Sequence, residues 1–250
     1  MRSDVCSLGR LSISHTQAGA PMAWHSTSSI TTSLPVARRM LSCSEPVKLW
    51  QMGLLADWCL GQYERAQAQA QLCVGLGRQA EYLLAEAHGL SLMGALALSE
   101  GSHAEARWLY ERAIAICRRI GQRDEMGWML AGLVTLELAA GNLARAREYL
   151  VESLQIAVDI RSFMTLLMAL LQAALHLVAW GEMERAVEVY AVVSHYPVLV
   201  HSEPNQVLVG RPITAAAGTL LPEVATATQD RGRALDLWDT TVELLAQLQR

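Results

Sequence analysis

The chain has 250 residues, of which 52% are hydrophobic and 18% are charged, so it can bury a sizeable core and disorder is not expected over most of its length. The formal net charge is -4 and there is no extended basic run, which argues against nucleic-acid binding, because that requires a cationic face. The five cysteines are odd in number and lack CxxC spacing, which favours reduced thiols in a cytoplasmic protein, three of them in the core.

Three regions follow one another along the chain. Residues 1–45 are rich in serine and threonine and have little periodicity, so we expect a poorly ordered segment there. They also lack the apolar stretch of a signal peptide. A helical pattern takes over at residue 46 and continues to about residue 200. Residues 201–250 are expected to form a linker and helices that cap the end of the preceding array.

A forty-residue period marks the central region. Each of four evenly spaced glycines is followed five residues later by an alanine, in the pairs Gly61 and Ala66, Gly101 and Ala106, Gly141 and Ala146, and Gly181 and Ala186. A fixed period of this kind indicates one structural unit repeated four times. Glycine readily takes the left-handed conformation that ends a helix, and alanine lets two helices approach closely. Each unit is therefore predicted to be helix A, a tight turn at the glycine, helix B and a longer connection.

The period also places the individual helices. Helix A is expected over residues 46–60, 80–99, 124–140 and 163–180, and helix B over residues 63–76, 103–119, 143–158 and 183–195. Ser102 and Asn142 directly follow a period glycine and are expected to cap the next helix with their side chains. After Pro197 the pattern breaks, and helices are expected over residues 213–220, 222–231 and 234–248.

The most apolar segment, residues 163–180, is almost long enough to cross a membrane. Thr165, Gln172 and His176 interrupt it, and it ends at a period glycine like the other units. We therefore interpret it as a buried helix and expect no membrane association.

Four residues after each alanine, helix B has a mostly large residue that is expected to fill the gap between units: Ala70, Tyr110, Leu150 and Tyr190. The turn and this stripe of helix B resemble the tetratricopeptide repeat. The first unit, Gly61-Gln62-Tyr63-Glu64-Arg65-Ala66, matches that family's Gly-x-Tyr-x-x-Ala turn fully, whereas the second has His103 in the tyrosine position. The period is forty rather than roughly thirty-four residues, and the family's closing proline is absent. The resemblance implies an all-α fold, a right-handed α-solenoid of about four helix pairs with C-terminal capping helices.

Longer units of this kind resemble the repeat region of large bacterial signalling ATPases, the LuxR-type and AfsR-type regulators related to the maltose-regulon activator. Residues 181–190, 221–224 and 231–237 carry this second resemblance. It implies a sensor or scaffold in bacterial signalling or transcription regulation. Two interpretations remain open: a non-catalytic binding module, or a regulatory fragment of a larger ATPase whose nucleotide-binding domain is missing here.

No catalytic, cofactor or metal site is expected. The chain lacks the GxxxxGK[ST] loop that holds nucleotide phosphates, and it has no GxSxG nucleophile turn. Its seven histidines form no HExxH motif and no close pair of metal ligands. We therefore predict a protein without enzymatic activity.

The candidate binding surface is a groove lined by helix A, as the family resemblance implies. Carrying over the inward positions one at a time selects Lys48, Gln51, Trp58, His88, Ser91, Trp128, Ala131, Thr135, Met168 and Leu171. Such a groove is apolar and aromatic with a few polar groups, which suits a protein or peptide partner, or a small-molecule inducer. The alternative is that Trp58, Trp128 and Met168 belong to the core. A purely structural assembly scaffold is a third possibility.

Overall fold

The computed structural model describes residues 56–200 and 202–250, without the side chains of residues 198 and 199. These residues belong to one compact unit, residues 33–250, and they form helices and no strands. The predictions for residues 1–45, for Lys48 and for Gln51 lie outside the described part. After helical residues 56–59, the helices are α3 (Tyr63–Gln79), α4 (Leu83–Ser99), α5 (His103–Ile120), α6 (Arg123–Ala139), α7 (Leu143–Ile160), α8 (Phe163–Trp180), α9 (Met183–Val193), α10 (Pro197–Val200), α11 (Glu203–Asn205), η1 (Gln206–Gly210), α12 (Arg211–Ala217), α13 (Pro222–Ala234) and α14 (Leu237–Leu248).

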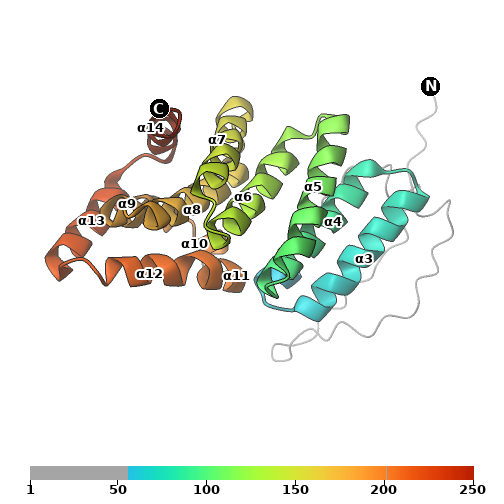
Figure 1. Cartoon of the computed structure of the whole chain (residues 1–250), viewed down its shortest axis with the longest axis horizontal. Coiled ribbons are helices and arrows are strands. Elements are labelled where there is room, and N and C mark those ends of the chain that lie inside the picture. Colours follow the sequence, from blue (N-terminus) through green and yellow to red (C-terminus); the bar gives the residue numbers. More distant parts are fainter. Residues whose placement is uncertain (1–55, 201) are drawn as a thin grey trace, which may run out of the picture. The chain divides into compact units, whose positions relative to one another are not determined.

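Helices α3 to α9 form a stack of antiparallel pairs in which each helix packs against the next (Figure 1). Helices α4, α6 and α8 are helix A of the second, third and fourth units, and α3, α5, α7 and α9 are helix B. All four period glycines end a helix A in the left-handed conformation, with φ between 70° and 87°. The four alanines five residues later are completely buried. The solenoid prediction and the role of the period are thus confirmed.

The predicted longer connection from helix B to the next helix A is wrong. These turns are as short as the others, and each contains its own left-handed residue: Glu81 with φ 58°, Gly121 with φ 72° and Arg161 with φ 51°. A left-handed residue therefore recurs every twenty residues from Gly61 to Gly181. This twenty-residue spacing is not visible in the sequence, because two of the three additional positions, Glu81 and Arg161, are not glycine.

The predicted side-chain caps at Ser102 and Asn142 are also wrong. Neither side chain bonds to the helix that follows it, and Asn142 donates instead to Glu137 at 2.9 Å. An effective N-cap residue has an extended backbone, whereas these two have ψ of 63° and 66°. Ser162, with ψ of 110°, does accept a hydrogen bond from the backbone of Thr165.

Helix A forms the inner layer of the stack. Residues 82–98 of the second unit, 126–138 of the third and 165–178 of the fourth include no exposed residue. Helix B, in contrast, exposes one face; α5, for example, exposes Trp108. Apolar helices buried on all sides agree with the low charge of the helix A segments.

Close contacts between units depend on small residues. The Tyr110 ring on α5 lies between Gly94 of α4 and Gly132 of α6, where an added Cβ would come within 3.2 and 2.5 Å of the ring. Tyr110 is 3% exposed, which confirms that the position four residues after the alanine fills the gap between units.

One described helix, α8, is long and apolar enough to cross a membrane. Two-thirds of it (67%) is buried within the protein. The core has two apolar clusters, one around α3 to α6 and a second around α7 to α9, and the buried leucines of α8 belong to the second. Burial of this kind is typical of a core helix.

The C-terminal helices cover the end of the stack. Helix α13 packs along α9, and Gly232 approaches the Glu188 backbone so closely that a Cβ would not fit. Helix α14 then folds back against α7, where the Arg147 Nε atom donates to the Leu248 carbonyl oxygen at 2.6 Å. The predicted capping helices are present, but the first is part of a helical stretch that begins at residue 203, so the predicted linker before residue 213 is wrong.

Candidate functional site

The predicted groove residues within the described part are mostly buried. Trp58, Ser91, Ala131, Thr135, Met168 and Leu171 are all less than 9% exposed, whereas His88 and Trp128 are partly buried. Trp58 and Met168 belong to the two apolar clusters of the core, as the alternative interpretation expected. Partner binding by these residues stays a prediction, and His88 and Trp128 have the most accessible surface for it.

Two polar contacts connect neighbouring A helices on this inner layer. The His88 Nε2 atom lies 2.8 Å from a carboxylate oxygen of Glu125 at the start of α6. The Thr135 hydroxyl donates to the Gln172 side-chain oxygen of α8 at 2.7 Å. These four polar side chains near the predicted groove therefore pair with one another within the stack.

A continuous helical stretch, residues 203–217, runs from the first unit to the fourth. It comprises α11, η1 and α12, and we call it the crossing helix (Figure 1). At its start, the Tyr63 hydroxyl donates to the Glu203 carboxylate, and Ser202 shares a side-chain hydrogen bond with Cys59. Farther along, it packs against α8 and α9, and the Gln206 amide donates to the Tyr190 hydroxyl at 3.4 Å.

The crossing helix turns an amphipathic face toward the stack. Asn205, Val209, Ile213 and Ala216 are buried at spacings of four, four and three residues. Such spacing places them on one side of a helix. Leu208 packs against both apolar clusters, so this segment joins the two halves of the core.

This helix is difficult to predict from the sequence, because Pro204 and Pro212 favour a linker. Pro204 occupies the first turn of the helix, where no intrahelical N–H bond is lost, whereas Pro212 lies inside the continuous stretch, directly after the π-helical turn. The i, i+4, i+8 spacing of Asn205, Val209 and Ile213 was the signal that could have revealed it.

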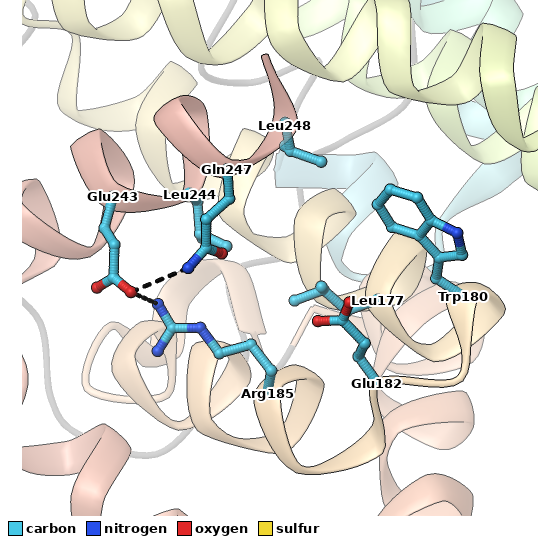
Figure 2. A pocket seen from close by; sticks show the side chains of 8 residues that line it. All are labelled: Leu177, Trp180, Glu182, Arg185, Glu243, Leu244, Gln247 and Leu248. Carbon is cyan, nitrogen blue, oxygen red and sulfur yellow. Dashed lines mark hydrogen bonds and ion pairs between the residues drawn. The ribbon is translucent and has the colours of Figure 1, made fainter. Parts of the chain in front are cut away.

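A second candidate site is a cleft between the α8–α9 turn and α14 (Figure 2). Its volume is about 520 Å³, and its lining residues are Leu177, Trp180, Glu182, Arg185, Glu243, Leu244, Gln247 and Leu248. Arg185 and Gln247 both point toward Glu243, at 3.1 Å each. Trp180 forms the opposite wall, and the Arg147 guanidinium lies 5.8 Å from its ring centre.

The forty-residue period explains the charges around this cleft. Four residues before and after the period glycine, the first unit pairs Asp57 with Arg65, and the third pairs Glu137 with Arg145, each at 3.5 Å. The fourth unit keeps the arginine as Arg185 but has Leu177 in place of the acid. The second unit has neither member, with Ala97 and Glu105 at these positions. The cleft therefore lies where the fourth unit lacks the acid of an ion pair that the first and third units share.

Helix α14 provides substitutes for that missing acid. Arg107 binds Glu137 in the third unit, and its counterpart Arg147 donates to the Leu248 carbonyl instead. Arg185, which has Arg145 as its counterpart, pairs with Glu188 at 2.6 Å and with Glu243 of α14. The two arginines thus hold the C-terminal helix.

Reactive groups are sparse in the described residues. Burial raises the pKa of the Cys73 and Cys117 thiols to about 12, so both are protonated near neutral pH and are poor nucleophiles. Within residues 56–200 and 202–250, no group of three or more His, Cys, Asp or Glu side chains could hold a metal ion.

Comparison with known families supports the repeat architecture. Residues 83–157, from the start of α4 to near the end of α7, match the family model of the tetratricopeptide repeat. This stretch is a tetratricopeptide-repeat region. Searches of curated proteins and of solved structures found no match to the chain. Nothing beyond the tetratricopeptide repeat links the chain to LuxR-type or AfsR-type ATPases, so that resemblance stays a prediction.

Proposed function

We propose that this protein is a non-catalytic binding module that holds a protein or peptide partner on its tetratricopeptide-repeat stack. The observation that carries the proposal is that the stack already accommodates a helix, residues 203–217, across its units. Repeats of this type suit a protein-binding scaffold, because stacked helix pairs present an extended surface. The buried thiols and the absence of a nucleotide-binding motif in the sequence support a role without catalysis.

We further propose that the module works in the cytoplasm as a scaffold or sensor in bacterial signalling or transcription regulation. The support is the resemblance of residues 181–190, 221–224 and 231–237 to the ends of large signalling regulators. A small-molecule inducer is a second possible ligand, and the cleft beside α14 has the size of a small-ligand site.

Two tryptophans on opposite layers provide the test. Trp128 lies on α6 in the inner layer, whereas Trp108 lies on α5 and is 53% exposed. The full-length protein is immobilised, and proteins captured from a bacterial extract are compared for wild type, Trp128→Ala and Trp108→Ala. We expect Trp128→Ala to lose a specific partner that Trp108→Ala retains.

If Trp108→Ala loses the partner and Trp128→Ala retains it, the partner binds the exposed face of helix B instead. If none of the three forms captures a specific partner, the proposed function is wrong. ATP hydrolysis by the purified chain would contradict its non-catalytic part.

A further inference from the structure

We infer that the crossing helix is a resident ligand of the stack, which an amphipathic helix of the binding partner displaces. This inference rests on the proposed protein-binding function and specifies its partner. The kind of helix that the partner should supply can be inferred from residues 203–217, because they already bind this surface as a helix.

The buried face of the crossing helix defines the chemistry of the partner. Its anchors Val209, Ile213 and Ala216 are at most 4% exposed, and Asn205 is 3% exposed. Glu203 meets the Tyr63 hydroxyl at the first unit. The partner helix should therefore have an acidic residue at its N-terminal end and aliphatic anchors six, ten and thirteen residues later, as in helix-in-groove recognition.

The crossing helix is a weak helix by its own composition. Pro212 lacks a backbone donor, Gly210 has a high entropic cost of ordering, and residues 206–210 form a π-helical turn. A regular helix with anchors of the same size would be ordered at a lower cost and would therefore bind the same surface more tightly.

The ends of the crossing helix allow it to leave without unfolding the stack. At its first end, its polar contacts to the described part of the first unit include those of Glu203 with Tyr63 and of Ser202 with Cys59. At its other end, residues 218–221 form an irregular turn, and Leu221 is 71% exposed. Helices α4 to α7 pack mainly against one another and against α3 and α8, so they can persist when the helix is released.

A labelled peptide of residues 202–218 tests displacement in full-length protein. Val209→Asp puts a charge on the buried face and should release the crossing helix, whereas Val207→Asp is a matched control at a position that is 39% exposed. Fluorescence polarisation should show the peptide binding Val209→Asp at least about tenfold more tightly than wild type or Val207→Asp. Equal binding to all three proteins, or no binding to a Val209→Asp variant whose circular dichroism remains helical, would overturn the inference.

A milder variant covers the case in which Val209→Asp does not fold. Tyr63→Phe removes the hydrogen bond to Glu203 and leaves the ring in place. Hydrogen exchange in residues 203–217 should then become faster, while exchange in α4 to α7 stays unchanged. Unchanged exchange in residues 203–217 would contradict a releasable helix.

The two proposals fail in distinguishable ways. Partner capture that depends on Trp128, combined with no peptide binding to a folded Val209→Asp variant, overturns the resident-ligand inference and leaves the binding function standing. If the labelled peptide binds Val209→Asp and the captured partner, added without a label, competes it away, both the binding function and the resident-ligand inference are supported.

Discussion

Arg107 of α5 and Glu137 of α6 form an ion pair at 2.5 Å in which the carboxylate has no exposed surface. Asn142 and Arg145 of the same unit complete the environment of this carboxylate, at 2.9 and 3.5 Å. The pair joins helix B of the second unit to helix A of the third. It therefore fixes the alignment of two neighbouring units within the tetratricopeptide-repeat region.

Glu137→Gln should destabilise the protein by about 1–3 kcal/mol, because it removes the charge partner of the Arg107 and Arg145 guanidinium groups, which are partly exposed. Urea denaturation measures the change. Glu152→Gln is the matched control, since Glu152 pairs with Arg118 at the surface at 3.2 Å and should cost less than about 1 kcal/mol. Equal losses in the two variants would show that burial does not strengthen the Glu137 pair.

The same carboxylate gives a pH dependence. Burial alone would raise the pKa of Glu137, but hydrogen bonds from Arg107 and Asn142 and the nearby arginine charges outweigh it and lower the pKa from its ordinary value of 4.5. Its stabilising contribution is therefore present above pH 4.5 and is lost as the pH falls through the lower pKa of the folded state. The acid limb of the stability profile should be shallower in Glu137→Gln than in wild type.

Gly132→Ala should destabilise the stack by about 1–3 kcal/mol, because the new methyl group would overlap the Tyr110 ring. Gly75→Ala is a matched control within α3, where a Cβ meets nothing within 4 Å. It should instead stabilise the helix by about 0.5–1 kcal/mol. Thermal denaturation of both variants separates the steric effect from helix propensity.

His176 should make the protein less stable in mild acid. It is 1% exposed, and neither ring nitrogen has a hydrogen-bond partner in the described structure. Burial, and to a smaller extent the charge of Arg147, lowers its pKa from 6.5. Below pH 6.5 the unfolded chain takes up a proton that the folded protein resists, so stability falls as the pH falls.

His176→Leu tests this dependence, since Leu96 and Leu136 occupy the same position in the preceding units. The variant should gain about 1–3 kcal/mol by removing an unsatisfied buried group. Its stability should also change less than that of wild type between about pH 7.5 and pH 5.5. His103→Leu, at an exposed position, is the control. If it reduces the pH dependence of stability as much as His176→Leu does, the dependence does not come from His176.

Arg161→Gly should stabilise the protein by about 0.5–1 kcal/mol, because Arg161 holds a left-handed φ of 51° that glycine adopts without strain. Gly121→Ala makes the opposite change at the equivalent turn, with φ 72°, and should destabilise by a similar amount. Chemical denaturation of the pair checks the sign. A loss of stability in Arg161→Gly would mean that the side chain contributes more than its backbone strain costs.

Leu177→Glu restores the acid that the fourth unit lacks. The new carboxylate should attract Arg147 and Arg185 as Glu137 attracts Arg107 and Arg145, and so weaken their hold on Leu248 and Glu243. Hydrogen exchange in α14 should accelerate by about tenfold in this variant. Leu177→Gln provides the uncharged control, and equal acceleration there would point to disrupted packing.

Much of the stack could be predicted from the sequence, because glycine at a left-handed turn and alanine at a close crossing leave a visible period. The turns at Glu81 and Arg161 could not, since residues of these types show no preference for the left-handed conformation. The inward positions of helix A were assigned from the family, but their burial depends on segments distant in sequence. Contacts such as that of Tyr63 with Glu203, 140 residues apart, leave no local pattern.

The crossing helix also changes how the stack should come apart. In an open array of repeats each unit contacts only its neighbours, so the terminal units can fray independently. Here residues 203–217 contact both the first unit and the fourth, so the two ends of the array are connected through this helix as well as through the units between them. While the crossing helix is bound, loss of either terminal pair costs contacts at the other end, so the two terminal pairs are expected to fray together rather than independently.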